Sequence, residues 1–113
     1  MSVRFVTLGE AEVVELEEGR LTSRRLVRKE HGSEKISFNV STLREGYQDA
    51  GVAYLGHDEI VYVLSGRAEV TVDGKSRIVG PGTAIFVPEG ERYGYRVLEG
   101  PNEVIAVFAP ARS

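Results

Sequence analysis

The sequence predicts an all-β domain made of short antiparallel strands. Apolar and polar residues alternate with a period of two in segments 36–41 and 67–72, as expected for strands with one buried face. Glycine and proline interrupt these segments at short intervals, and no segment carries a clear helical start signal. Short strands separated by turns every 8–12 residues or so are typical of a β-sandwich or β-barrel.

The N-terminal third contains an acidic stretch at 10–18 followed by a basic stretch at 20–29. Segments 13–18 and 21–30 are too short, or too poorly capped, to predict helices, so we interpret both as strand or loop. The opposite charges fit two interpretations. One is a pair of solvated edge strands that attract each other, and the other is a basic rim that steers an anionic small molecule.

The next predicted strand alternates along 36–41. Its apolar residues are expected to face the core and its polar residues the solvent. The first set is Ile36, Phe38 and Val40, and the second is Ser37, Asn39 and Ser41.

Two later strands are joined by a turn dipeptide. Ala68, Val70 and Val72 alternate with polar residues, and Asp73-Gly74 follows directly. Asp-Gly tolerates positive φ and is a strong signal for a tight hairpin. The last predicted strand is the apolar run 104–108.

Composition excludes several classes of protein. The 113 residues fit one domain, and 42% hydrophobic with 27% charged residues is ordinary for a globular chain. There is no cysteine, so disulfides and thiolate sites are excluded. The net charge of −3 argues against nucleic acid as a partner. No apolar run or leader pattern suggests a membrane or secretion, so cytoplasmic is the default expectation.

Two spaced motifs carry the strongest signal. In the first, Glu59 is followed after six residues by Gly66, and the second has Gly82, Pro88 and Gly90 in a Gly-x5-Pro-x-Gly pattern. Together they resemble the cupin superfamily, in particular its small single-domain cupin_2-type members. The resemblance implies a double-stranded β-helix, or jelly-roll barrel. We expect one cupin domain over 1–113, with a core at about 36–110 and flanking strands within 1–35.

The resemblance also places a metal site. Metal-binding cupins carry three histidines and one glutamate on this frame, and the corresponding positions here are Ala53, Leu55, Glu59 and Tyr93. Losing three nitrogen donors sharply weakens binding of a divalent transition metal. We therefore expect no metal cofactor. The alternative is a divalent transition metal in a rearranged site of Glu59, His57 and Tyr93.

Within the superfamily, the motifs look most like those of the ethanolamine-utilisation cupin. The likeness covers 56–66, the Asp73-Gly74 turn and 81–90. That family also lacks the histidine set and keeps an acidic residue at the Glu59 position. Its long N-terminal region has no counterpart here.

The candidate site follows from the frame. Glu59 is the candidate catalytic acid or base, with His57 as a second catalytic group two residues earlier. Tyr93 and Tyr95 share a strand face, and Tyr54 lies nearby in the sequence; these three are candidate ligand-binding residues. A solvent-exposed His57 and purely structural tyrosines are the competing interpretations.

The sequence thus predicts a small cupin that binds a small polar or anionic metabolite without the usual metal site. The alternative is a metal-dependent dioxygenase, isomerase or lyase with the rearranged Glu/His/Tyr site. A purely structural role for the barrel is a third hypothesis. A homodimer is also expected, formed through N-terminal strands that extend the partner's sheet.

Overall fold

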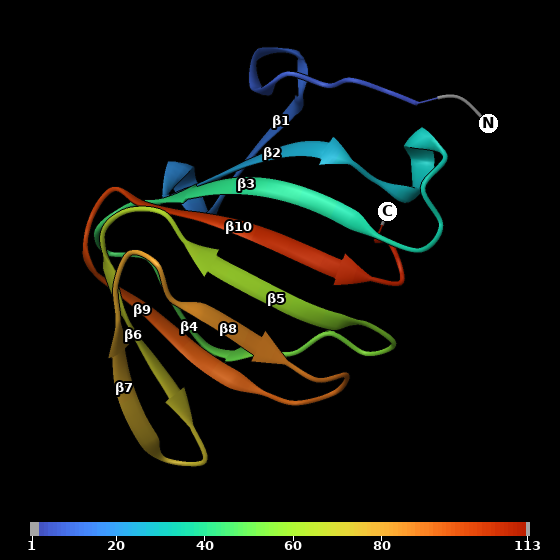
Figure 1. The fold of residues 1–113 in the computed structure, drawn as a ribbon. Helices are drawn as coiled ribbons and strands as arrows, with labels where there is room; N and C mark the ends of the chain where they lie inside the picture. Colours follow the sequence, from blue (N-terminus) through green and yellow to red (C-terminus); the bar gives the residue numbers. More distant parts are fainter. Residues whose placement is uncertain (1–2, 113) are drawn as a thin grey trace.

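The computed structural model describes residues 3–112 as two facing antiparallel sheets (Figure 1). Residues 1, 2 and 113 of the predicted domain lie outside the described residues. The larger sheet contains, in order, β1 (Glu12–Leu16), β2 (Leu21–Val27), β3 (Ser37–Leu43), β10 (Asn102–Ala109), β5 (Asp58–Val63) and β8 (Ala84–Val87). The smaller contains β4 (Gln48–Val52), β9 (Tyr93–Glu99), β6 (Arg67–Val72) and β7 (Lys75–Val79). The predicted jelly-roll barrel is confirmed.

Helical structure is confined to three short 3-10 turns within residues 3–112. They are η1 (Leu8–Glu10), η2 (Glu17–Gly19) and η3 (Lys29–His31). No helix in this part of the chain has the length and hydrophobicity needed to cross a membrane.

The hydrophobic core lies between the two sheets. Each strand directs alternate residues inward, so β5 contributes Val61 and Val63 while β6 contributes Ala68 and Val70. Val63 and Ala68 have no exposed surface. Burying a large apolar side chain stabilises the fold by roughly 1.5–3 kcal/mol. A slip of one residue in the strand pairing would expose all of these side chains, so the alternation fixes the register.

The predicted hairpin between β6 and β7 is confirmed. Val72 pairs with Lys75, and both connecting residues have positive φ, 51° at Asp73 and 76° at Gly74. This backbone is the type I′ turn that Asp-Gly favours, and its twist matches that of the strands.

Gly66 of the first motif has a different and stricter reason to be glycine. Its φ is +75°, and a Cβ there would lie 2.5 Å from the carbonyl oxygen of Glu99 and 2.7 Å from that of Pro101. The chain after β5 passes directly against the turn between β9 and β10, which only glycine permits. The motif glycine therefore closes one end of the barrel.

The N-terminal strands extend the larger sheet of their own chain. β1 pairs with β2, and β2 pairs with β3 along its length. In this register Glu12 lies opposite Arg25, so the acidic and basic stretches do run side by side.

The strand predicted at 36–41 is present as β3, but its two faces are reversed. Ser37 is fully buried, whereas Ile36 is 51% exposed. Asn39 and Ser41 face the space between the sheets, and Phe38 lies on the outer side. The reason is tertiary: the inner face of β3 borders a polar cavity, so its inward residues need not be apolar.

Candidate functional site

A cavity of about 180 Å³ opens between the two sheets, next to the hydrophobic core, and shares residues such as Val61 and Val104 with it. Its volume corresponds to about six water molecules at roughly 30 Å³ each. Both sheets line it, and the polar part of the lining is large: Ser23, Arg25, Asn39, Ser41, Asp49, Glu59, Arg112 and four tyrosines. A small polar metabolite fits these dimensions.

Glu59 is the buried acid of this cavity. It lies on β5 with only 4% of its surface exposed, and the alternation that buries Val61 and Val63 directs it inward. Tyr93 reaches it from β9 in the facing sheet, and the Tyr93 hydroxyl donates a 2.8 Å hydrogen bond to Oε1 of Glu59. The pair therefore bridges the two sheets across the cavity.

The environment shifts both members of the pair toward their protonated forms. Burial raises the pKa of Glu59 to about 6, although the Tyr93 hydrogen bond and the charge of Arg112 act in the opposite direction. Burial, followed by the neighbouring Glu59 carboxylate, raises the pKa of Tyr93 well above its ordinary value. Near neutral pH, the Tyr93 hydroxyl therefore stays protonated and can donate a hydrogen bond, while the Glu59 carboxyl titrates about one pH unit below neutrality. This is the arrangement expected of a proton-transfer group.

Arg112 brings a positive charge to the same cavity. Its guanidinium carbon lies 4.4 Å from the ring centroid of Tyr54 and 5.0 Å from that of Phe108. Tyr54 in turn packs edge-on against Phe108, with centroids 4.8 Å apart. Burial, followed by the Glu59 charge, raises the pKa of Tyr54, while Arg112 opposes this shift. The two rings hold the guanidinium by cation–π contacts.

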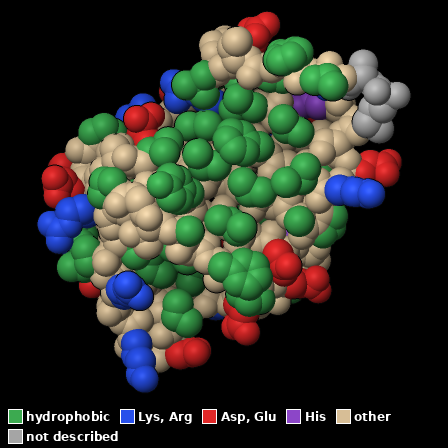
Figure 2. Space-filling view, viewed as in Figure 1, with side chains coloured by type: hydrophobic (Ala, Val, Ile, Leu, Met, Phe, Trp, Pro, Cys, Tyr) green, Lys and Arg blue, Asp and Glu red, His purple; other side chains and the backbone are tan. Residues whose placement is uncertain are grey.

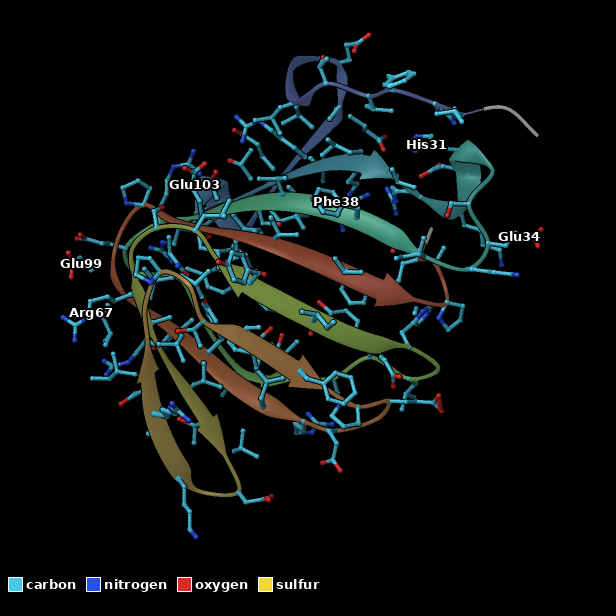
Figure 3. All side chains as sticks on the ribbon, in the orientation of Figure 1. His31, Glu34, Phe38, Arg67, Glu99 and Glu103 are labelled. Atoms are coloured by element: carbon cyan, nitrogen blue, oxygen red, sulfur yellow. The ribbon has the colours of Figure 1, made fainter. Side chains whose placement is uncertain are left out.

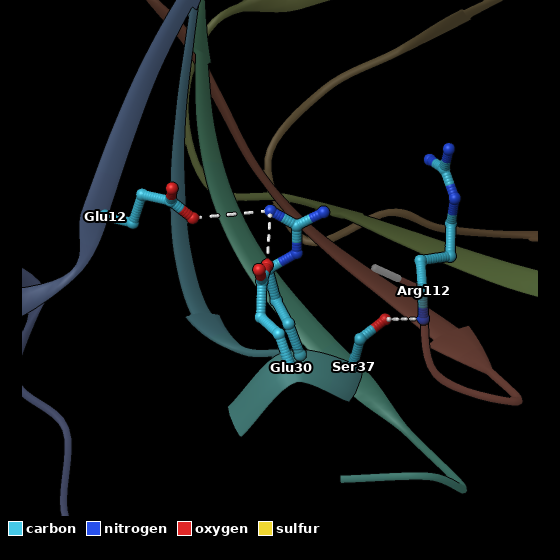
Figure 4. A network of polar contacts seen from close by, with 5 residues as sticks. Glu12, Glu30, Ser37 and Arg112 are labelled. Carbon is cyan, nitrogen blue, oxygen red and sulfur yellow. Dashed lines mark hydrogen bonds and ion pairs between the residues drawn. The ribbon is translucent and has the colours of Figure 1, made fainter. Parts of the chain in front are cut away.

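The backbone of Arg112 is anchored on the neighbouring strands (Figure 4). Its amide donates a 3.1 Å hydrogen bond to Oγ of the buried Ser37, and its carbonyl accepts a 3.0 Å bond from the amide of Lys29. The adjacent Arg28 is held by Glu12 at 3.4 Å and Glu30 at 3.2 Å. These backbone bonds attach the C-terminal segment to β3 and η3. They leave the side chain of Arg112 available to line the cavity.

A second wall of the cavity comes from β2 and β3. It contributes Arg25 together with Ser23, Asn39 and Ser41. Burial lowers the pKa of Arg25, with the nearby Arg28 adding to the effect. Among the described residues, Oδ1 of Asn39 is buried without a hydrogen-bond partner. A buried acceptor of this kind is satisfied when a hydroxyl or amine donates to it.

Tyr95 also lines the cavity, but its hydroxyl is already engaged in a hydrogen bond. It donates to Oδ1 of Asn102, whose Nδ2 donates a 2.8 Å bond to the carbonyl of Ser65. Tyr47 packs edge-on against Tyr95, with centroids 6.5 Å apart. Burial, followed by Asp49, raises the pKa of Tyr47 to about 12. These two tyrosines supply ring surface to the cavity.

His57 does not line the cavity. Its Nδ1 donates a 2.7 Å hydrogen bond to the carbonyl of Pro110, and its ring lies edge-on to Phe108 at 6.4 Å. The strand begins only at Asp58, and Gly56 has a φ of +81°, so the alternation that directs Glu59 inward does not extend back to His57. The structure therefore brings Glu59, Tyr93, Tyr54 and Tyr95 to one cavity and leaves His57 outside its lining.

The residues do not fit a three-histidine, one-glutamate metal site. Leu55 is 84% exposed, and neither it nor Ala53 lines the cavity. Within residues 3–112 there is no group of three His, Cys, Asp or Glu side chains placed to hold an ion. A metal bound by Glu59, His57 and Tyr93 remains a prediction, and it requires His57 to turn into the cavity.

The sequence did not indicate Arg112 or Asn39 as site residues, and it indicated Arg25 only as part of the basic stretch 20–29 that could form a rim for an anionic small molecule. Arg24 and Arg25 are adjacent and chemically identical, and only the sheet register decides which one faces inward. Arg112 lies far from Glu59 in the sequence and reaches it because β10 pairs with β5. One signal in the sequence could have indicated Asn39: the polar residues that alternate along the strand at Ser37, Asn39 and Ser41. This pattern identifies a polar face, but it does not show whether that face contacts solvent or a cavity.

Similar sequences share half of this chain. The pectin degradation protein KdgF of Dickeya dadantii (strain 3937) is 37% identical over 57 residues, which cover 50% of this chain and 52% of that protein. An uncharacterised protein of Streptomyces coelicolor, SCO3923, is 34% identical over 56 residues, covering 50% and 53%. The chain thus matches about half the length of these curated relatives.

Solved structures similar to this chain cover nearly all of its length. KdgF from Halomonas sp. has a TM-score of 0.86 at 23% identity, covering 99% of this chain and 97% of that one. The Clostridium difficile EutQ protein has a TM-score of 0.72 at 23% identity, covering 92% and 77%. The motifs predicted a likeness to the ethanolamine-utilisation cupin. EutQ is a structural neighbour of this chain, but its TM-score is lower than that of KdgF.

The family model described as Cupin_2, a cupin domain, matches residues 45–108, more than half of the chain. This range contains both spaced motifs, with Glu59 in the first and the turn before Tyr93 in the second. The chain belongs to the Cupin_2 family of cupin domains.

Proposed function

We propose that the cavity binds a small sugar acid and that Glu59 transfers a proton on it. The observation that carries this proposal is the buried Glu59–Tyr93 pair, set in a polar cavity that also holds two arginines. The sequence match to a pectin degradation protein supports the ligand class, because pectin is a polymer of uronic acids.

The two arginines account for the acid part of the ligand. Arg25 and Arg112 both line the cavity. A guanidinium presents a planar fork of donors that matches the two oxygens of a carboxylate. Arg112 is fixed by the Tyr54 and Phe108 rings, so little side-chain freedom is lost when it binds.

The β2–β3 wall accounts for the sugar part. Oδ1 of Asn39 needs a donor, and the hydroxyls of Ser23 and Ser41 can donate or accept. A hydroxylated ligand satisfies these groups, whereas an apolar ligand of the same size leaves Asn39 unpaired at a penalty of roughly 1–3 kcal/mol. The wall therefore selects a polyol over a simple fatty or aromatic acid.

Glu59 and Tyr93 account for the chemistry. With its pKa raised to about 6, the Glu59 carboxylate is largely ionised at neutral pH and is basic enough to accept a proton from the ligand. Tyr93 remains protonated and can donate a hydrogen bond to an oxygen that becomes negative. Returning the proton from Glu59 to another ligand atom is the step that isomerases and lyases share.

Isothermal calorimetry with D-galacturonate and with D-galactose tests the ligand class. The two sugars differ only at C6, so binding of galacturonate alone assigns the recognition to the carboxylate. We expect Arg112→Gln to weaken galacturonate binding by about 10- to 100-fold, as for loss of one charge-assisted pair. Glu59→Gln should retain binding and lose turnover.

Two outcomes would contradict this function. Equal affinity for the two sugars, or no binding of any uronate, removes the argument from the arginines. A saturable one-to-one heat with Ni²⁺ or Zn²⁺ that disappears in Glu59→Gln would instead support the alternative metal-dependent enzyme with Glu59, His57 and Tyr93 as ligands.

A further inference from the structure

Three arginines lie directly opposite a glutamate in the strand registers of residues 3–112. The pairs are Arg67 with Glu99, Arg96 with Glu69, and Arg25 with Glu12. Residues in such positions have Cβ atoms about 5 Å apart, which is close enough for their side chains to form an ion pair. The three pairs can therefore be compared directly.

Two of the three pairs form the expected ion pair. Nη1 of Arg67 lies 3.6 Å from Oε2 of Glu99, a pair that Figure 3 labels. Nη2 of Arg96 lies 3.2 Å from Oε1 of Glu69. On the face drawn in Figure 2, most Lys and Arg side chains likewise lie close to Asp or Glu. Pairing with the opposite glutamate is thus the ordinary outcome for an arginine on these sheets.

Arg25 is the exception. Oε1 of Glu12 instead lies 3.4 Å from Nη1 of Arg28, and Oε1 of Glu30 lies 3.2 Å from the same nitrogen (Figure 4). Within residues 3–112, no hydrogen bond or ion pair involves the guanidinium of Arg25, which lines the cavity. Its donors are therefore available to a ligand.

A β-bulge in β2 brings Arg28 to the side of Arg25. The strand register shifts between Arg25 and Val27, so Leu26 is an extra residue on this strand. Leu26 and Val27 both line a groove on the side of the sheet away from the cavity. Two successive residues on one side shift the alternation by one position, so the next residue, Arg28, returns to the side of Arg25. Without the bulge, the alternation would direct Arg28 to the opposite side.

Burial makes Arg28 the stronger partner for Glu12. Arg28 is only 8% exposed, whereas Arg25 is half-buried. A buried guanidinium needs opposite charge nearby, because it has lost most of its contact with water. Glu12 supplies this charge from β1, and the η3 turn brings Glu30 to the same guanidinium. Arg28 therefore holds both carboxylates.

We propose that Arg28 is a positioning residue: by holding Glu12, it keeps Arg25 available for the carboxylate of the ligand. This role rests on the proposed function, in which Arg25 binds that carboxylate. Without Arg28, Glu12 would turn to Arg25, the residue opposite it, as the glutamates of the other two pairs do. The ligand carboxylate would then compete with Glu12 for the same guanidinium.

Isothermal calorimetry with D-galacturonate tests this role. Arg28→Gln should weaken binding by about 10-fold, because Glu12 then occupies Arg25. Adding Glu12→Gln should restore the affinity to within about 2-fold of that of the unmodified chain. The matched control adds Glu30→Gln to Arg28→Gln instead. It has the same net charge as the first double variant but keeps Glu12, so its binding should remain about 10-fold weaker.

Arg28→Lys keeps the test readable if Arg28→Gln does not fold, because lysine retains the positive charge and a long apolar stem. An ammonium holds a carboxylate in a less fixed geometry than a guanidinium does, so we expect a loss of about 3-fold that Glu12→Gln again reverses. Unchanged affinity in the Arg28 variants, or equal recovery with Glu30→Gln and with Glu12→Gln, would overturn the proposal.

A crystal structure of the Arg28 variant without ligand separates this role from the proposed function. We expect the Glu12 carboxylate to lie within about 4 Å of the Arg25 guanidinium, as in an ion pair. A Glu12 side chain that stays away from Arg25 would overturn the proposal. If the unmodified chain binds no uronate, the proposed function fails, and the distance between Glu12 and Arg25 alone decides whether Arg28 keeps Arg25 unpaired.

Discussion

Tyr93 and Tyr95 lie two residues apart on the inner face of β9, and they serve two different ends of the barrel. Both are buried, and both hydroxyls donate to a residue on the facing sheet. Tyr93 donates to the Glu59 carboxylate beside the cavity. Tyr95 donates to the amide of Asn102, which is fully buried and also bonded to Ser65.

The difference lies in the partner. At the Asn102 end, neutral donors and acceptors satisfy one another, so burial leaves no charge to stabilise. At the Glu59 end, a carboxylate is buried, and this burial raises its pKa even though the hydrogen bond from Tyr93 acts in the opposite direction. The first end stabilises the fold, and the second holds a group whose charged form destabilises it. Such a group is expected at a working site.

Replacing Asn102 should have the largest effect on this comparison. Asn102→Ala leaves the Tyr95 hydroxyl and the Ser65 carbonyl without their partner, and we expect it to lower the free energy of unfolding by about 3 kcal/mol. Urea denaturation measures this loss. Tyr95→Phe, which removes only one bond, should lose about 1 kcal/mol. A loss below about 1 kcal/mol in Asn102→Ala would show that the network does not hold the closed end.

Glu59→Gln should raise the free energy of unfolding, whereas Asn102→Ala lowers it. The gain should appear only as the pH rises above about 4.5. A pKa raised from 4.5 to about 6 means that folding disfavours the charged form. Below pH 4.5 the carboxyl is protonated in both the folded and the unfolded chain, so the free energy of unfolding carries no penalty from its charge. As the pH rises through 6, the free energy of unfolding falls by about 2 kcal/mol in total. The variant should therefore match the unmodified chain at pH 4 and exceed it by up to about 2 kcal/mol at pH 8.

Denaturation series at several pH values measure this gain. Glu91→Gln on the exposed loop before β9 is the control for loss of one negative charge. A Glu59→Gln variant that is less stable than the unmodified chain at pH 8 would mean that the carboxylate is a structural acceptor, like the Asn102 amide.

Tyr93→Phe and Tyr95→Phe form the most sensitive pair. Because the Tyr93 hydrogen bond lowers the pKa of Glu59, removing it should raise that pKa above 6, whereas Tyr95→Phe should leave it unchanged. Carbon-detected NMR titration of the Glu59 carboxyl measures both values. Equal shifts in the two variants would show that the two ends of the barrel are coupled.

Much of the fold could be predicted from local signals. The positive φ values at Asp73 and Gly74 follow from a dipeptide, and the inward direction of Glu59 follows from the alternation of its own strand. The cupin motifs added the arrangement of sheets. For His57, the alternation was extended one residue beyond the start of the strand at Asp58, into the turn that contains Gly56.

The site was predicted only in part, because its walls come from distant segments. The direction of Arg25 depends on the pairing of β2 with β3, and the place of Arg112 depends on the pairing of β10 with β5. The reversed faces of β3 have the same origin. A period of two separates polar from apolar residues, but it does not say which set faces the interior.

The sequence by itself determined the all-β class, the hairpin, the barrel family and the inward Glu59. Each of these depends on residues close together in the chain, where steric limits on φ and alternation along a strand act directly. The tertiary structure alone decided that polar side chains of β2 and β3 face a cavity, that Arg112 reaches it, and that Arg28 rather than Arg25 holds Glu12. These features depend on which strands become neighbours, and that is set by packing of the whole chain.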